Sequence, residues 1–286
     1  MICIVRRLLH AFFACAIVVS ALAPHAARAD APPSAARYYA EAVRTMGRLP
    51  VPPYLTYRVR ILENGKKPDR YQYRLRTRDG RAVDRLLPRG AWQLDPGHLF
   101  DPTWAGAYDL VQYGLKAFND RTKAPSPSPM PHAKVDGMKI IAIVSAVAPS
   151  AYRISDRGAA LCPNGAPGHA LHLDAIRDPK EHMLSHVVIE SATGRFCSMR
   201  FSFGASVIAL GLTGYIDLHF GAIDRYWLVR DARVFIGART FGVQVAHDTL
   251  GVAYRAMAFP AALPDALFVV GPRPSPSPTR AQLNGE

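Results

Sequence analysis

Four histidines and three acidic residues lie close together near the middle of the chain: His169, His172, His182, His186, Asp174, Asp178 and Glu181. Zinc needs three or four such ligands converging on one point. Glu181 precedes both histidines of the pair His182 and His186, so the stretch is not the H-E-x-x-H motif of zinc hydrolases. We therefore predict no metal site here and place these histidines at strand ends. The alternative is an exported zinc hydrolase that uses His172, His182 and His186.

No other stretch predicts a reaction. Ser206 lies in Gly-Ala-Ser-Val-Ile and not in the G-x-S-x-G motif of serine hydrolases. Asp217, Asp224 and Asp231 fall at turn or strand positions where single carboxylates are common, and no glycine-rich phosphate loop occurs. We therefore expect a binding protein, not an enzyme, with no cofactor.

The cysteines indicate an oxidising compartment. Cys3 and Cys15 lie in a leader segment, described below, which leaves Cys162 and Cys197 as one pair. Two cysteines in an exported chain favour a disulfide, here between a turn-rich loop and a strand. Two free buried thiols are the alternative.

The first 29 residues have the three marks of a secretory signal peptide. Arg6 and Arg7 are the basic start, Leu8–Ala23 is the apolar run, and Ala27-Arg28-Ala29 is a small-x-small cleavage site. Cleavage after Ala29 predicts a periplasmic or extracellular protein. An uncleaved anchor is the alternative, although the apolar run is short for a membrane span.

Charge and composition limit the partners. Removing the leader takes away three arginines and no acid, so the net charge falls from +13 to +10. A basic exported protein is expected to meet anionic partners, and an anionic membrane surface fits this better than nucleic acid. The composition is 49% hydrophobic, which supplies the core of one domain over residues 30–268. We expect a monomer.

The elements around the histidines are predicted to be strands. His169–Leu173, Leu184–Glu190 and Arg195–Phe203 are separated by the turn signals Asp178-Pro179 and Thr193-Gly194. Further strands are predicted at Met138–Val147, Ala151–Ser155, Tyr215–Phe220, Arg225–Phe235, Ala238–Ala246 and Gly251–Phe259. Their spacing is typical of an antiparallel sheet that curls on itself.

The N-terminal part combines one helix with a meander. Apolar residues at spacings of three and four predict a helix over Ala35–Met46. Tyr54–Glu63, Arg70–Arg78 and Arg81–Leu87 alternate between apolar and polar residues, and Asn64-Gly65 and Asp79-Gly80 supply the turns. These strands should present one aromatic and aliphatic face and one arginine-rich face.

The remaining segments are expected to carry little regular structure. A short helix is predicted from Pro102 or Thr103 to about Tyr113. Alternating prolines over residues 124–131 predict an exposed extended linker, and residues 269–286 a disordered tail. The predicted fold class is mainly β (α+β): a curled antiparallel sheet forming a half-open β-barrel, with an N-terminal helix and few other helices.

A curled sheet gathers its apolar side chains on the concave side, where a ligand groove can form. The residues that we predict to line it are Tyr57, Val59, Tyr71, Tyr73, Met199, Phe201 and Trp227. A core filled by the protein's own side chains is the alternative.

This layout resembles the lipoprotein-carrier superfamily, which includes LolA, LolB and the sensor RseB. The residues that carry the resemblance are Val135-Asp136-Gly137, His172-Leu173 with Asp178-Pro179, and the paired strands Leu184–Glu190 and Arg195–Phe203. The resemblance covers about Ser34–Phe268 and implies a half-open barrel whose apolar cavity holds acyl chains under helices. We therefore expect an exported envelope protein that binds a lipid or lipoprotein acyl chain. The alternative is a structural or sensor protein that binds a protein partner.

Overall fold

The computed structural model describes residues 34–95, 100–112, 143, 145–207, 210–240 and 243–270. The predicted signal peptide, the proline-rich linker, the Val135-Asp136-Gly137 stretch and the tail beyond residue 270 lie outside these ranges. Residues from Ala35 onward form one compact unit. Among the described residues, no helix is long and apolar enough to cross a bilayer.

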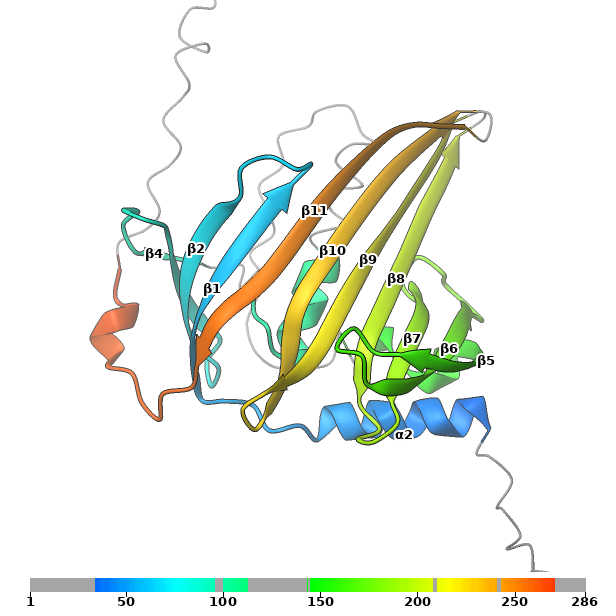
Figure 1. The fold of residues 1–286 in the computed structure, drawn as a ribbon, viewed down its shortest axis with the longest axis horizontal. Coiled ribbons are helices and arrows are strands. Elements are labelled where there is room, and N and C mark those ends of the chain that lie inside the picture. Colours follow the sequence, from blue (N-terminus) through cyan, green and yellow to red (C-terminus); the bar gives the residue numbers. More distant parts are fainter. Residues whose placement is uncertain are drawn as a thin grey trace, which may run out of the picture. The chain divides into compact units, whose positions relative to one another are not determined.

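One antiparallel sheet of eleven strands dominates this unit (Figure 1). The N-terminal strands are β1 (Tyr54–Glu63), β2 (Asp69–Arg76), β3 (Arg81–Leu86) and β4 (Gln93–Leu94). The central strands are β5 (Tyr152–Leu161), β6 (Pro167–Ala175), β7 (Leu184–Glu190) and β8 (Phe196–Val207). The last three are β9 (Leu210–Ile223), β10 (Tyr226–Thr240) and β11 (Val243–Ala258). Helix α2 spans Ala35–Gly47, and short 3-10 helices occupy Pro149–Ala151 (η1) and Asp265–Phe268 (η2).

The strand order explains how the sheet stays open. It runs β4-β3-β2-β1-β11-β10-β9-β8-β7-β6-β5, so the N-terminal meander docks on the last strand of the chain. The two edge strands, β4 and β5, do not pair with each other. The predicted half-open β-barrel is therefore confirmed.

Local sequence signals set the first hairpin. Asn64 and Gly65 both have positive φ, 47° and 72°, as a tight turn between right-handed twisted strands requires. The observed register then places Tyr57 opposite Tyr73 and Leu55 opposite Leu75. This pairing confirms the predicted aromatic and aliphatic face.

Two predicted strands are wrong. The run Met138–Val147 was expected to be a buried strand, but residues 143, 145 and 146 are helical. A continuous apolar run fits a buried helix as well as a buried strand, and the buried residues Ile143, Ala146 and Val147 have helical spacing. Ala238–Ala246 is not one strand, because β10 ends at Thr240 and β11 begins at Val243.

Helix α2 covers one end of the sheet and packs mainly against β5 and η1. It buries Tyr39, Ala42 and Met46, and the Tyr39 hydroxyl donates a 2.9 Å hydrogen bond to the Val147 carbonyl oxygen. The helix predicted over Ala35–Met46 is confirmed, with one further residue at its C-terminal end.

The predicted disulfide is present. Cys162 and Cys197 are bonded, with Cα atoms 5.6 Å apart, and they close a loop between residues separated by 35 positions. Closing a loop of this length stabilises the fold by about 4 kcal/mol in the chain-entropy treatment. The bond fastens the turn after β5 to the start of β8.

Candidate functional site: the concave face of the sheet

The concave face is built by alternation in neighbouring strands. In β8 and β9, Met199 lies opposite Leu218 and Phe201 lies opposite Ile216, and all four are buried. In β1 and β2, Tyr57, Val59 and Tyr73 are also buried, while the residues that alternate with them along the strands, such as Arg58 and Gln72, are polar. The result is an apolar wall that runs across the sheet.

The seven residues predicted to line a groove all belong to this wall or its border. Tyr57, Val59, Tyr73, Met199, Phe201 and Trp227 are buried, and Tyr71 is half-buried. They form two groups, one on β1 and β2 and one on β8 and β10. The indole nitrogen of Trp227 donates a 2.9 Å hydrogen bond to the Phe196 carbonyl oxygen, so that residue has a structural role as well. Their role in ligand binding stays a prediction.

A helical cover, residues 104–112, lies against the wall behind β9–β11 in Figure 1. It buries Trp104, Ala107, Leu110 and Val111. Trp104 contacts Phe196 and Phe220 on the sheet, with ring centroids 6.0 and 5.9 Å apart. The described part of the concave face is thus filled by the protein's own side chains in this state.

The start of the helical cover is fastened locally. The Thr103 amide donates to an Asp101 carboxylate oxygen at 2.8 Å, and the Gly106 amide donates to the Thr103 hydroxyl at 3.2 Å, which is an N-cap. The Val229 amide donates to the Pro102 carbonyl oxygen at 2.8 Å. Trp104, Leu110 and Val111 of the cover pack into the same apolar core as the wall. The predicted short helix is confirmed for the residues that the structure describes.

Tyr254 is a wall residue that the sequence analysis missed. It is 3% exposed, and its ring lies 6.0 Å from that of Tyr57. Its hydroxyl is buried and has no hydrogen-bond partner among the described residues. Burial raises the pKa of Tyr254 well above its usual value, and the Asp101 and Asp109 carboxylates raise it further. The hydroxyl is therefore a neutral donor on the apolar wall, and the described residues give it no acceptor.

The signal that could have found Tyr254 is the alternation of β11, which puts Val252 and Tyr254 on one face. That alternation breaks at a bulge opposite β1, where Ala256 has a φ of 50°. The bulge shortens the stretch of β11 over which apolar and polar residues alternate. The sequence contains no turn residue there that would predict the bulge.

A small pocket of about 310 Å³ opens beside the helical cover. Apolar and polar side chains share its lining, which is Tyr108, Gln112, Ser145, Ala146, Lys180, Glu181 and Met183. Its volume is at the lower end of the range of about 300–1,000 Å³ that is typical of small-molecule sites. It leads from solvent to the edge of the cover.

The histidines do not form the alternative metal centre. His172 and His186 lie opposite each other on the outer face, with ring nitrogens 3.1 Å apart, and His172 also contacts Asp174 at 3.1 Å. His182 instead packs edge-on against Tyr152. Among the described residues, no group of three histidine, cysteine, aspartate or glutamate side chains is placed to hold a metal ion.

Comparison with known proteins gives distant structural similarity only. No protein-family model matches the sequence, and no curated protein matches it. The chain is similar to a putative outer membrane lipoprotein-sorting protein domain from Vibrio parahaemolyticus, at 12% identity and a TM-score of 0.38. That match covers 80% of this chain and 95% of the other.

It is also similar to a LolA superfamily protein from Nitrosomonas europaea, at 14% identity and a TM-score of 0.34. Here the match covers 82% of this chain and 97% of the other. Both solved structures carry names from the superfamily that the sequence layout resembles. The assignment of the fold rests on the strand order and register described above.

Proposed function

We propose that this protein is an exported carrier that holds the acyl chain of a lipid or lipoprotein against the concave face of its sheet. The observation that carries the proposal is the apolar wall, which extends across the strands from β2 to β8 and is covered by a helical segment. Apolar burial is non-directional, so an acyl chain can replace the side chains of the helical cover on this wall at little cost.

The closed packing is compatible with binding because the cover is joined to the wall mainly by side chains. A segment with few backbone hydrogen bonds to its neighbours is the kind that opens locally at low free-energy cost. The pocket beside Tyr108 and Met183 gives a ligand a place to enter at the edge of the cover.

The Tyr254 hydroxyl adds a polar point of recognition. A buried hydroxyl without a partner costs free energy that an acceptor on a ligand would recover. The ester or amide carbonyl of an acylated lipid or lipoprotein is such an acceptor, and it sits next to the apolar chain that the wall would hold. The wall and the hydroxyl therefore match the two ends of one acyl group.

The test is displacement of a fluorescent fatty acid by phospholipid from the chain beginning at Asp30, which retains every described element. Ile61→Lys and Leu62→Lys form a matched pair, because they place the same charge on neighbouring residues of β1 that face opposite sides. Ile61 is half-buried and packs on the core, whereas Leu62 is 36% exposed.

We expect the parent protein to show saturable displacement. Ile61→Lys should weaken it at least tenfold, because an ammonium group next to the acyl chain loses hydration without gaining a partner. Leu62→Lys should leave it unchanged. Absence of saturable binding by the parent, or equal loss in both variants, would contradict the proposal.

A further inference from the structure

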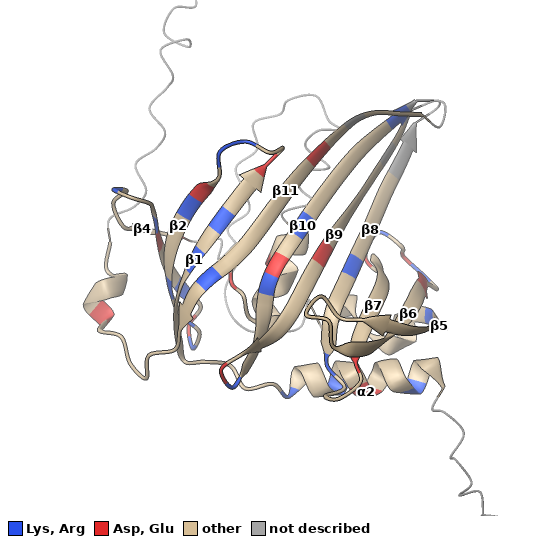
Figure 2. Ribbon diagram, in the orientation of Figure 1, with Lys and Arg blue, Asp and Glu red and all other residues tan. Residues whose placement is uncertain are grey.

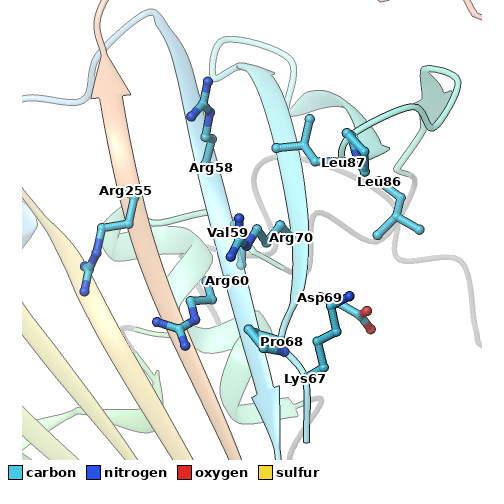
Figure 3. Close-up of a pocket in the computed structure, with 11 residues that line it drawn as sticks. Arg58, Val59, Arg60, Lys67, Pro68, Asp69, Arg70, Leu86, Leu87 and Arg255 are labelled. Carbon is cyan, nitrogen blue, oxygen red and sulfur yellow. The ribbon is translucent and has the colours of Figure 1, made fainter.

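The outer face of the sheet brings four arginines together where β2, β1 and β11 run side by side. The register places Arg60 directly opposite Arg70 and Arg58 directly opposite Arg255. We call these four residues the arginine cluster. Basic residues recur along β1 and β2 in Figure 2, β11 carries Arg255, and Figure 3 shows the four side chains on these strands. All four are exposed.

Two other arginines of the sheet form ion pairs with acids. Arg200 pairs with Asp217 at 2.6 Å, and Arg76 pairs with Asp79 at 2.6 Å. In the arginine cluster, by contrast, the described residues supply no ion pair. The Arg255 guanidinium donates to the carbonyl oxygen of its neighbour Tyr254, and to no other group among the described residues.

Like charges directly opposite each other on a sheet are destabilising. The cluster contains two such pairs, and the described residues form no ion pair with them. An anion bound across the arginine cluster would offset this repulsion and so stabilise the folded protein.

The arginine cluster lines an open cleft of about 960 Å³. The other charged groups there are Lys67 and Asp69, so five cations share the cleft with one carboxylate. Apolar residues complete it on the side of β3, namely Leu86, Leu87 and Pro88. Leu86 is 43% exposed, and Leu62, on the outer face of β1, is 36% exposed.

Guanidinium groups bind phosphate oxygens with two parallel hydrogen bonds, and they do so better than ammonium groups. Adjacent strands are about 4.8 Å apart, so the cluster extends about 10 Å across three strands. This is wider than one phosphate group, and it is bordered by exposed leucines. A layer of phosphate headgroups over hydrocarbon offers both the repeated charge and the apolar contact.

We propose that the arginine cluster docks the protein on a membrane surface through the phosphate groups of anionic phospholipids. The exposed leucines beside it contact the border between headgroups and acyl chains. This surface lies on the opposite face of the strands from the apolar wall, so it does not depend on the proposed acyl-chain binding.

The test is sedimentation of the chain beginning at Asp30 with vesicles of phosphatidylcholine alone and of phosphatidylcholine with phosphatidylglycerol. The cluster variant is Arg60→Gln with Arg70→Gln, which removes one opposed pair. The control is Arg157→Gln with Arg177→Gln, the same change of charge at exposed residues near β5 and β6. Thermal unfolding of each variant checks the fold, and the cluster variant should keep or raise Tm because a repulsion is removed.

We expect the parent to bind the anionic vesicles and not the neutral ones, with binding that falls as salt is added. The cluster variant should bind about 30-fold more weakly, from the usual contribution of two basic residues at an anionic surface. The control variant should bind like the parent.

Three results would overturn the proposal. Equal weakening in both variants would mean that net charge acts without a docking site. Binding of inorganic phosphate in calorimetry, lost in the cluster variant and without vesicle binding, would assign the cleft to a free phosphate. Binding of neither vesicles nor phosphate would remove any role in anion recognition.

Discussion

Removing one oxygen atom from Tyr254 tests whether its hydroxyl is reserved for a ligand. The residue is 3% exposed, and its hydroxyl has no partner among the described residues. An unsatisfied buried polar group costs about 1–3 kcal/mol. Tyr254→Phe keeps the ring and its contact with Tyr57, so it should raise the free energy of unfolding of the ligand-free protein by about that amount.

Tyr39 supplies the matched control, because it is equally buried and its hydroxyl is satisfied. That hydroxyl donates to the Val147 carbonyl oxygen at 2.9 Å. Tyr39→Phe removes the same atom but leaves a buried carbonyl without its donor, so it should lower the free energy of unfolding by about 1 kcal/mol. The two substitutions remove the same atom but should change the free energy of unfolding in opposite directions.

The measurement is urea unfolding followed by circular dichroism, with lipid removed beforehand. A second titration with a fatty-acid methyl ester reports binding. Tyr254→Phe should weaken ester binding about threefold to tenfold, which is the usual worth of one hydrogen bond. Tyr39→Phe should not change ester binding, because its hydroxyl points to the backbone.

The reasoning is refuted if Tyr254→Phe destabilises the ligand-free protein as Tyr39→Phe does. The hydroxyl would then have an acceptor within the folded chain, and a ligand carbonyl would have nothing to gain from it. If Tyr254→Phe is more stable than the parent but binds the ester equally well, the apolar wall would bind the acyl chain without help from the Tyr254 hydroxyl.

Two further results are expected. Replacing both Cys162 and Cys197 with alanine should lower the free energy of unfolding by about 4 kcal/mol, seen as a lower urea midpoint, and the same shift should follow reduction of the parent. Burial lowers the pKa of His186 below its usual value, and the neighbouring His172 and Arg200 lower it further. Because the unfolded chain then binds more protons, stability should fall as pH drops from about 6.5 through the folded pKa. His186→Gln should flatten that part of the stability–pH curve, and an unchanged slope would count against this assignment.

The N-terminal meander could be predicted almost residue by residue, because its signals are local. Clean alternation and an Asn-Gly turn determined β1 exactly and β2 and β3 to within two residues at either end. The disulfide also followed from the sequence, since one cysteine pair lies outside the predicted signal peptide.

Features that depend on distant contacts were not predictable. The pairing of β1 with β11 joins residues nearly two hundred positions apart, and no local sequence pattern predicts it. The helical residues 143, 145 and 146 form where an apolar run meets Tyr39 and Tyr152, whose hydroxyls bond to carbonyls of that segment. The burial of the Tyr254 hydroxyl could not be predicted for the same reason, because it depends on residues distant in sequence that pack against it.

The two proposed surfaces are opposite faces of the same strands, and the pairing of β1 with β11 fixes both. Asn64 holds that pairing at its end: its amide donates to the Thr249 carbonyl oxygen, its side-chain oxygen accepts from the Thr249 amide, and its side-chain nitrogen donates to Asp248. A slip by one residue would exchange the faces of β1, since side chains alternate strictly. It would bury Arg58 under the helical cover, where taking a guanidinium out of water costs several kcal/mol. The register that puts Tyr57 on the apolar wall is therefore the one that gathers the arginines outside.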